Sequence, residues 1–173
     1  TSNSLGVRAA QLAYGTLCYL LFLGTFLYAI GFVGNAWGAL GWNAPFFRSM
    51  DVGGKSASLG EALLVDALLL VVFAVQHSGM AREGFKRWWT RIIPKQIERS
   101  TYVLTASLCL ALLFWQWRPS GTTSMWNLTG TPWEPVLVAL SAAGWLIVLA
   151  ATFLINHFEL FGLQQVWQAF HGT

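Results

Sequence analysis

Charged residues are scarce in this sequence, and their scarcity excludes an ordinary soluble domain. Asp, Glu, Lys and Arg make up 10% of the 173 residues, whereas they make up about 25% of a soluble domain. Hydrophobic residues reach 55%, and the mean hydropathy is +0.55. The net charge of +3 reflects one basic segment, so no nucleic-acid partner is expected. This composition predicts a polytopic membrane protein.

Cysteine pairs and common enzyme motifs are also missing. The two cysteines, Cys18 and Cys109, fall inside apolar runs and form no Cys-x-x-Cys pair, so no structural disulfide is expected. The sequence has no nucleophile elbow, phosphate-binding loop or glycine-rich dinucleotide fingerprint. Its histidine and cysteine spacings match no metal motif, so no metal site is predicted. Short motifs alone therefore assign no enzyme class.

What the sequence does contain is four apolar runs of membrane-spanning length, at about 12–34, 59–76, 100–117 and 135–155. At about 1.5 Å per residue, a helix of about 20 residues crosses roughly 30 Å of hydrocarbon. The first run is not followed by a small-residue cleavage pattern, so we interpret it as a span and not as a signal peptide. We predict an all-α fold, a polytopic helical bundle with four transmembrane helices in a single membrane domain over 1–173.

A basic segment lies between the second and third runs. It holds six of the ten Lys and Arg residues of the chain: Arg82, Lys86, Arg87, Arg91, Lys95 and Arg99. Apolar residues recur among them at helical spacing, which predicts an interfacial amphipathic helix within 78–94, ended by Pro94. The expected partner of this basic 82–99 loop is the lipid bilayer with its anionic headgroups.

The basic segment also predicts which way the protein faces. Basic loops between spans lie in the cytoplasm, so four spans place the N-terminus and the C-terminus there as well. The C-terminal segment 156–170 mixes apolar and polar residues and is predicted to be a second interfacial segment. Polar side chains from several parts of the chain then gather at the cytoplasmic face: His77, Arg82, Glu98, Arg99, Asn156, His157 and Glu159.

Two histidines, His77 and His157, end predicted spans at the same depth. A histidine or glutamate at a half-buried site could act as a general base. Two histidines at one depth could also ligate a haem or a metal ion. The alternative is that both are hydrogen-bonded side chains at helix ends. The residues alone leave these interpretations open.

Asp66 is the clearest charge inside a predicted span. Such charges are unfavourable in hydrocarbon and usually face a partner or a cavity. Asp66 and His77 are eleven residues apart, about three helical turns, so they share a helix face. Asp66 therefore either lines a polar cavity, or it pairs with a neighbouring helix or lies near the outer interface.

Longer motifs resemble a known family. They are G-T-F-L-Y-A-I-G-F-V-G-N at 24–35, Q-H-S-G-M-A-R at 76–82, F-K-R-W-W-T-R at 85–91, P-K-Q-I-E-R-S-T-Y-V-L at 94–104, L-L-F-W-Q-W-R-P at 112–119 and L-I-N-H-F-E-L-F-G-L-Q-Q-V-W at 154–167. In these segments the sequence resembles the bacterial membrane-bound methanethiol S-methyltransferases, which belong with the isoprenylcysteine carboxyl methyltransferase-like proteins. The resemblance covers nearly the whole chain.

The resemblance implies an enzyme of the bacterial inner membrane that moves a methyl group from S-adenosylmethionine to methanethiol, a small thiol, giving dimethyl sulfide. The protein has to supply a thiolate, alignment and exclusion of water. In this hypothesis a histidine is the base, an arginine stabilises the thiolate or the cofactor carboxylate, and Glu98 and Asn156 orient them. The candidate catalytic residues are His157, His77 and Glu98, and the candidate substrate- or cofactor-binding residues are Arg82, Arg99, Asn156, Glu159 and Asp66.

The resemblance also implies a longer protein. Family members continue beyond the position of Thr173, and their cofactor-binding portion, with an Arg-His-Pro segment and a paired-Glu segment, lies in that continuation. This sequence holds no such segment. We therefore expect either an incomplete chain or a shortened relative. Three functions stay open. The first is the methyltransferase, and the second is a non-catalytic membrane subunit that packs within or helps assemble a larger membrane complex. The third, less favoured, is a haem- or pigment-binding bundle through His77 and His157.

Overall fold

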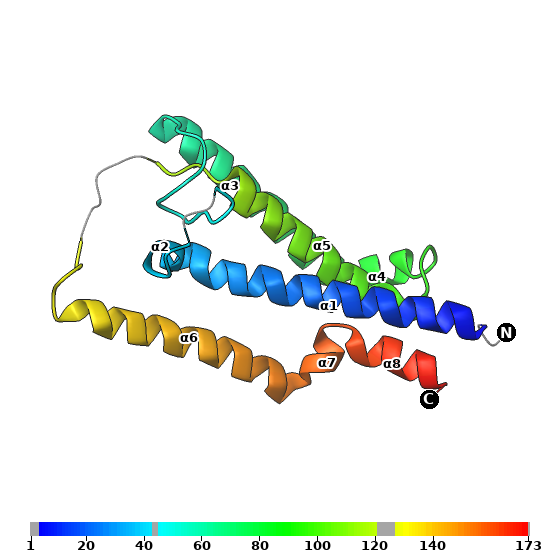
Figure 1. The fold of residues 1–173 in the computed structure, drawn as a ribbon. Coiled ribbons are helices and arrows are strands. Elements are labelled where there is room, and N and C mark those ends of the chain that lie inside the picture. Colours follow the sequence, from blue (N-terminus) through cyan, green and yellow to red (C-terminus); the bar gives the residue numbers. More distant parts are fainter. Residues whose placement is uncertain (1–3, 43–44, 121–126, 173) are drawn as a thin grey trace.

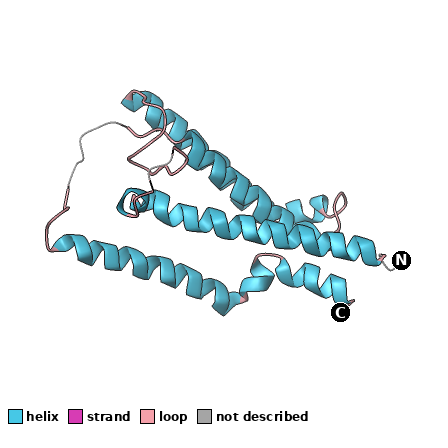
Figure 2. Cartoon of the chain, viewed as in Figure 1, coloured by secondary structure: helices cyan, strands magenta, loops and turns pink. Residues whose placement is uncertain are grey.

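The computed structural model describes residues 4–42, 45–120 and 127–172, and every regular element in these residues is a helix (Figure 1 and Figure 2). The bounds of the helices are α1 Leu5–Val33, α2 Ala36–Ala39, α3 Leu59–Ala81, α4 Glu83–Trp89, α5 Lys95–Gln116, α6 Trp133–Ile155, α7 His157–Leu160 and α8 Leu163–His171. The predicted all-α fold is confirmed.

Four of the described helices, α1, α3, α5 and α6, are long and apolar enough to cross a membrane. They correspond to the predicted spans, so the chain is a multi-pass membrane protein. Each of these helices begins or ends outside its predicted apolar run, because the helical hydrogen bonds continue into the neighbouring polar residues. For example, α1 already begins at Leu5, where the Ser4 hydroxyl accepts a hydrogen bond from the N–H of Val7 at 3.4 Å.

The basic segment forms a shorter helix than predicted. Helix α4 ends at Trp89, and the apolar pair Ile92 and Ile93 follows it in turns. At this end the Thr90 hydroxyl donates to the carbonyl of Lys86 at 2.8 Å, and the Thr90 N–H donates to the same carbonyl at 2.9 Å. Pro94 does not end this helix but directly precedes α5. A position of α4 on the membrane surface stays a prediction.

Helix α5 lies at the centre of the bundle and packs against α1, α3 and α8 (Figure 1). The most buried apolar cluster, Phe32, Leu113 and Phe114, joins α1 to α5 near the end opposite the described termini. Helix α6 differs from the other three long helices, because none of its residues is buried. Its clearest contact with α1 is between the rings of Phe26 and Trp145, whose centroids are 5.5 Å apart.

Helix α8 folds back onto the bundle. Val166 is 0% exposed, and its methyl groups lie so close to Gly15 of α1 that a Cβ there would come within 2.7 Å of them. Gly162 makes the preceding turn with φ +85°, a left-handed conformation that favours glycine, and lies against Ser100 of α5. Part of the apolar face expected to lie at the interface is therefore buried in protein, while Trp167 stays exposed.

We expect Gly15→Ala to destabilise this packing. The added Cβ would lie 2.7 Å from a methyl carbon of Val166, and overpacking of this kind costs about 1–3 kcal/mol. The loss is measured as a lower free energy of unfolding in a denaturant titration of the protein in detergent micelles.

Gly144→Ala in α6 is the matched control, because a Cβ there meets nothing within 4 Å. It should leave the free energy of unfolding unchanged or raise it slightly, because alanine has a higher helix propensity than glycine. Equal effects of the two substitutions would contradict a close contact of α8 with α1.

Candidate functional site

A polar pocket is lined by residues of α4, α5 and the α7–α8 segment. These helices meet at the end of the bundle where both described termini lie (Figure 1). The volume of the polar pocket is about 460 Å³. Its lining residues are Lys86, Lys95, Glu98, Arg99, Ile155, Asn156, Glu159, Leu160 and Gln165. Four residues that the sequence analysis singled out, Glu98, Arg99, Asn156 and Glu159, thus share one cavity.

The charges around the polar pocket come from separate helices. Lys86 belongs to α4, Lys95, Glu98 and Arg99 to α5, and Glu159 to α7. Three cations therefore face two carboxylates. This mixture suits a ligand that carries both an anionic group and hydrogen-bond donors, with a slight excess of positive charge.

Arg99 is held in place from two sides. Its Nε donates to the carbonyl oxygen of Leu160 at 2.6 Å, which satisfies a carbonyl at the end of α7. Its guanidinium lies 5.0 Å from the ring centroid of Tyr102, a cation–π distance. Arg99 thereby connects α5 to the α7–α8 segment and fixes one wall of the polar pocket.

Asn156 forms the turn between α6 and α7. Its φ of 118° lies in the left-handed region, which a non-glycine residue rarely adopts and which stores strain. Its amide nitrogen donates to Glu159 Oε2 at 3.0 Å and to Gln164 Oε1 at 2.8 Å, and its Oδ1 accepts from the Glu159 N–H at 3.4 Å. Asn156 therefore orients Glu159 within the polar pocket.

Gln165 is a pocket residue that sequence analysis did not single out. Its Nε2 donates to the carbonyl of Glu159 at 3.1 Å. Its Oε1 is buried and has no hydrogen-bond partner among the described residues. An unpaired buried acceptor is unfavourable by about 1–3 kcal/mol, so a donor from a ligand or a water molecule would stabilise it. Only the turn at Gly162 brings this residue to the pocket, and no sequence spacing reveals that.

His157 lies outside the polar pocket and is 3% exposed. Its Nε2 is 2.7 Å from the Tyr19 hydroxyl, and its Nδ1 is 2.7 Å from the Thr152 hydroxyl. Because the Thr152 hydroxyl donates to the Leu149 carbonyl at 2.7 Å, we assign the proton of the neutral ring to Nδ1 and the accepting role to Nε2. The ring also stacks on Phe153 with centroids 4.3 Å apart.

Burial lowers the pKa of His157 below the usual value of 6.5. A neutral ring with both nitrogens hydrogen-bonded matches the helix-end interpretation given above. His157 joins the start of α7 to α1 through Tyr19, and its geometry leaves no lone pair directed at the polar pocket.

His77 and Arg82 do not line the polar pocket either. His77 is exposed on α3, where the Tyr102 hydroxyl lies 3.0 Å from its Nδ1. Arg82 is exposed between α3 and α4. Each of His77 and His157 thus has a tyrosine partner of its own. In the part of the chain that the structure describes, no group of three or more metal-ligating side chains occurs.

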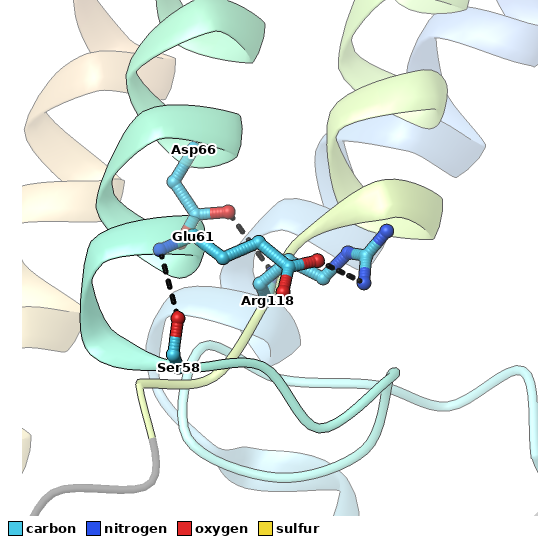
Figure 3. A network of polar contacts seen from close by, with 4 residues as sticks. All are labelled: Ser58, Glu61, Asp66 and Arg118. Atoms are coloured by element: carbon cyan, nitrogen blue, oxygen red, sulfur yellow. Dashed lines mark hydrogen bonds and ion pairs between the residues drawn. The ribbon is translucent and has the colours of Figure 1, made fainter.

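Asp66 lies near the opposite end of the bundle. Its Oδ1 accepts a hydrogen bond from the backbone N–H of Arg118 at 2.9 Å, just beyond the end of α5 (Figure 3). The Arg118 side chain also pairs with Glu61 at 3.3 Å. Of the two interpretations of Asp66, pairing with a neighbouring segment describes its position, and Asp66 does not belong to the polar pocket.

Several proteins of known sequence are similar to this chain. Methanethiol S-methyltransferase of Crocosphaera subtropica is 51% identical over 170 residues, which are 98% of this chain and 62% of that protein. Methanethiol S-methyltransferase of Mycobacterium tuberculosis is 50% identical over 165 residues, which are 95% of this chain and 64% of that protein. Nurim of Mus musculus is 34% identical over 119 residues, covering 65% of this chain and 45% of that protein.

These comparisons confirm the resemblance inferred from the motifs. The matches to the two methyltransferases cover nearly the whole chain, but the chain spans less than two thirds of these proteins, 62% and 64% of their lengths. No family model matches the chain, and no solved structure matches it.

The environment of His157 predicts a loss of stability in mild acid. The pKa of His157 is about 6.5 in the unfolded chain, and burial lowers it in the folded chain. As the pH falls below about 6.5, the unfolded state binds more protons, so the free energy of unfolding decreases. His157→Gln removes the group and should flatten this part of the profile, measured by denaturant titration between pH 8 and pH 5.

His171→Gln is the control, because His171 is exposed on α8. This variant should keep the wild-type decrease in mild acid. A profile that stays equally steep in His157→Gln would show that His157 is not the titrating group.

Proposed function

The chain is a relative of the methanethiol S-methyltransferases, and we propose that it forms the membrane portion of an enzyme that transfers a methyl group from S-adenosylmethionine to methanethiol, giving dimethyl sulfide. The observation that carries this proposal is the polar pocket, where Lys86, Arg99, Glu159 and Gln165 converge at one end of an otherwise apolar bundle. The activity is proposed for a complete protein that contains these residues.

We propose that the residues of the polar pocket contribute to the cofactor site together with the cofactor-binding portion that the family resemblance implies, because they fit the polar groups of S-adenosylmethionine. Its carboxylate can bind to Lys86, Lys95 or Arg99 through charge-assisted hydrogen bonds. Its ammonium and ribose hydroxyl groups can donate hydrogen bonds to the carboxylate of Glu159 and to the unpaired Oε1 of Gln165. A buried acceptor without a partner supports a ligand with donors at this place.

When bound, S-adenosylmethionine supplies an electrophilic methyl group on a sulfonium sulfur. The side chains of the pocket have to favour the thiolate, because an alkyl thiol is mostly protonated at neutral pH. Lys86, Lys95 and Arg99 favour the anion through their positive charge, and the proton can leave to water at the open side of the pocket. Alignment comes from Arg99 and Asn156, whose own hydrogen bonds fix them.

His157 is proposed to position the site and not to act as the base. Its Nε2 already accepts from Tyr19 at 2.7 Å, and its ring is 3% exposed. This contact holds the start of α7 against α1, and α7 carries Glu159. Loss of the imidazole would therefore disturb the pocket through α7.

The orientation in the membrane is also a proposal. The basic end of the bundle is assigned to the cytoplasm of a bacterial inner membrane because basic loops are retained on that side. Arg87 and Arg91, which are exposed, are expected to contact anionic headgroups. The small, apolar thiol can then reach the polar pocket from the bilayer.

A second function is favoured by helix α6. No residue in the apolar stretch of α6 is buried. Among the described residues, α6 has its main helix contacts with α7. Such a surface suits another membrane helix as well as lipid. A non-catalytic subunit of a larger membrane complex would use α6 for packing, and it would form no dimethyl sulfide when purified as a complete protein.

The methyltransferase proposal predicts that Lys86→Gln impairs methyl transfer. No described hydrogen bond of the fold uses the Lys86 ammonium group, so its loss should act mainly on the ligand. We expect kcat/KM to fall about 10- to 100-fold, the worth of one charged hydrogen bond. The assay follows dimethyl sulfide in the headspace by gas chromatography, with the complete protein in nanodiscs and with varied S-adenosylmethionine.

Arg87→Gln is the matched control, since Arg87 is the next residue of α4 but does not line the polar pocket. It should keep the wild-type kcat/KM. Equal losses in the two variants would assign the effect to the net charge of α4 and would contradict a ligand contact of Lys86.

A further inference from the structure

A second, apolar groove lies between α1 and α5, toward the end of the bundle opposite the polar pocket. Its volume is about 830 Å³. Leu17, Leu21, Gly24 and Tyr28 of α1 form one side, and Ala111 and Phe114 of α5 form the other. The methyl-transfer proposal does not use this groove.

The length of the groove matches one leaflet of a bilayer. From Leu17 to Tyr28 the axis of α1 rises about 17 Å, and one leaflet of hydrocarbon is about 15 Å thick. At Gly24 a Cβ would meet nothing within 4 Å, so the groove is open at the middle of its α1 side. An acyl chain fits such an elongated apolar space.

One end of the groove carries positive charge. The Tyr28 hydroxyl accepts from the Arg48 N–H at 2.8 Å and donates to the Phe46 carbonyl at 2.5 Å, which fixes the 46–48 loop over this end. Arg48 lines the groove and also a smaller cavity that it shares with Lys55 and Arg118. Cations therefore cluster where the headgroup of a lipid would lie.

Two of these cations are not neutralised within the described residues. The Arg48 side chain donates to the carbonyls of Pro45 and Trp115 there, and no salt bridge with a carboxylate is found for Arg48 or Lys55. Arg118 differs, because it pairs with Glu61 at 3.3 Å (Figure 3). The positive charge near Arg48 and Lys55 thus lacks a complementary anion.

We propose that this groove binds an anionic phospholipid, with one acyl chain between α1 and α5 and the phosphate against Arg48 and Lys55. The apolar length, the open space at Gly24 and the uncompensated cations at one end together fit an amphipathic ligand with a negative headgroup. A zwitterionic lipid such as phosphatidylcholine also carries a phosphate, but its choline ammonium offsets that charge, so an anionic lipid should be preferred at the two cations.

Native mass spectrometry of the complete protein tests this proposal. The protein is exchanged into detergent with equal amounts of dioleoyl-phosphatidylglycerol and dioleoyl-phosphatidylcholine. Wild type should retain a single phosphatidylglycerol. Gly24→Phe adds a ring at a position that lines the groove and where a Cβ meets nothing within 4 Å, so it should lose this lipid. Gly144→Phe, at an equally open position on α6, should keep it.

Charge variants separate the headgroup from the acyl chain. Lys55→Gln, at an exposed position without a described contact, should lower the preference for phosphatidylglycerol, and Lys55→Gln with Arg48→Gln should abolish it. Equal retention by Gly24→Phe and Gly144→Phe would overturn the proposal in favour of annular lipid only. Wild-type retention without headgroup preference would overturn it too, as would a dimer that Gly24→Phe dissociates.

Discussion

The close contact of α8 with α1 and α5 is the constraint on which the functional end of the structure depends. Val166 is wholly buried against Gly15, and Gly162 turns the chain tightly against Ser100. This return brings Asn156, Glu159 and Gln165 opposite the charged residues of α4 and α5. Without it the polar pocket would lose one wall. Small residues at the contact therefore determine where the charged groups meet, although they carry no chemistry themselves.

The two ends of the bundle use their polar groups differently. At one end the polar pocket combines cations, carboxylates and a buried acceptor that lacks a partner, which is the composition of a binding site. At the other end Arg118 binds both Asp66 and Glu61 and holds α3 to the end of α5. Arg48 and Lys55 at this second end have no salt bridge among the described residues, and we propose a lipid there. Methyl transfer at the first end is instead supported by the mixture of cations and carboxylates that lines the polar pocket.

The sequence predicted the parts of this account that depend on composition and on position along a helix. The four spans follow from hydropathy and length alone, and Glu98, Arg99, Asn156 and Glu159 were placed at one end of the bundle from charge bias. Features that depend on contacts between distant segments of the chain could not be predicted from the sequence. The partners of His157 belong to α1 and α6, and Gln165 reaches the pocket only through the turn at Gly162. Its predicted depth in the membrane made His157 a candidate base, but both of its ring nitrogens are hydrogen-bonded, so we propose a positioning role for it.

We propose that the polar pocket holds a ligand with the polar groups of S-adenosylmethionine. The most direct test of this proposal uses the three lysines of the chain, Lys55, Lys86 and Lys95. Two of them line the polar pocket and Lys55 lies apart from it. Amine-labelling rates are measured by mass spectrometry on the complete protein in nanodiscs, with and without S-adenosylhomocysteine. The account predicts slower labelling of Lys86 and Lys95 and an unchanged rate at Lys55. Unchanged rates at all three, at a saturating ligand concentration, would contradict it.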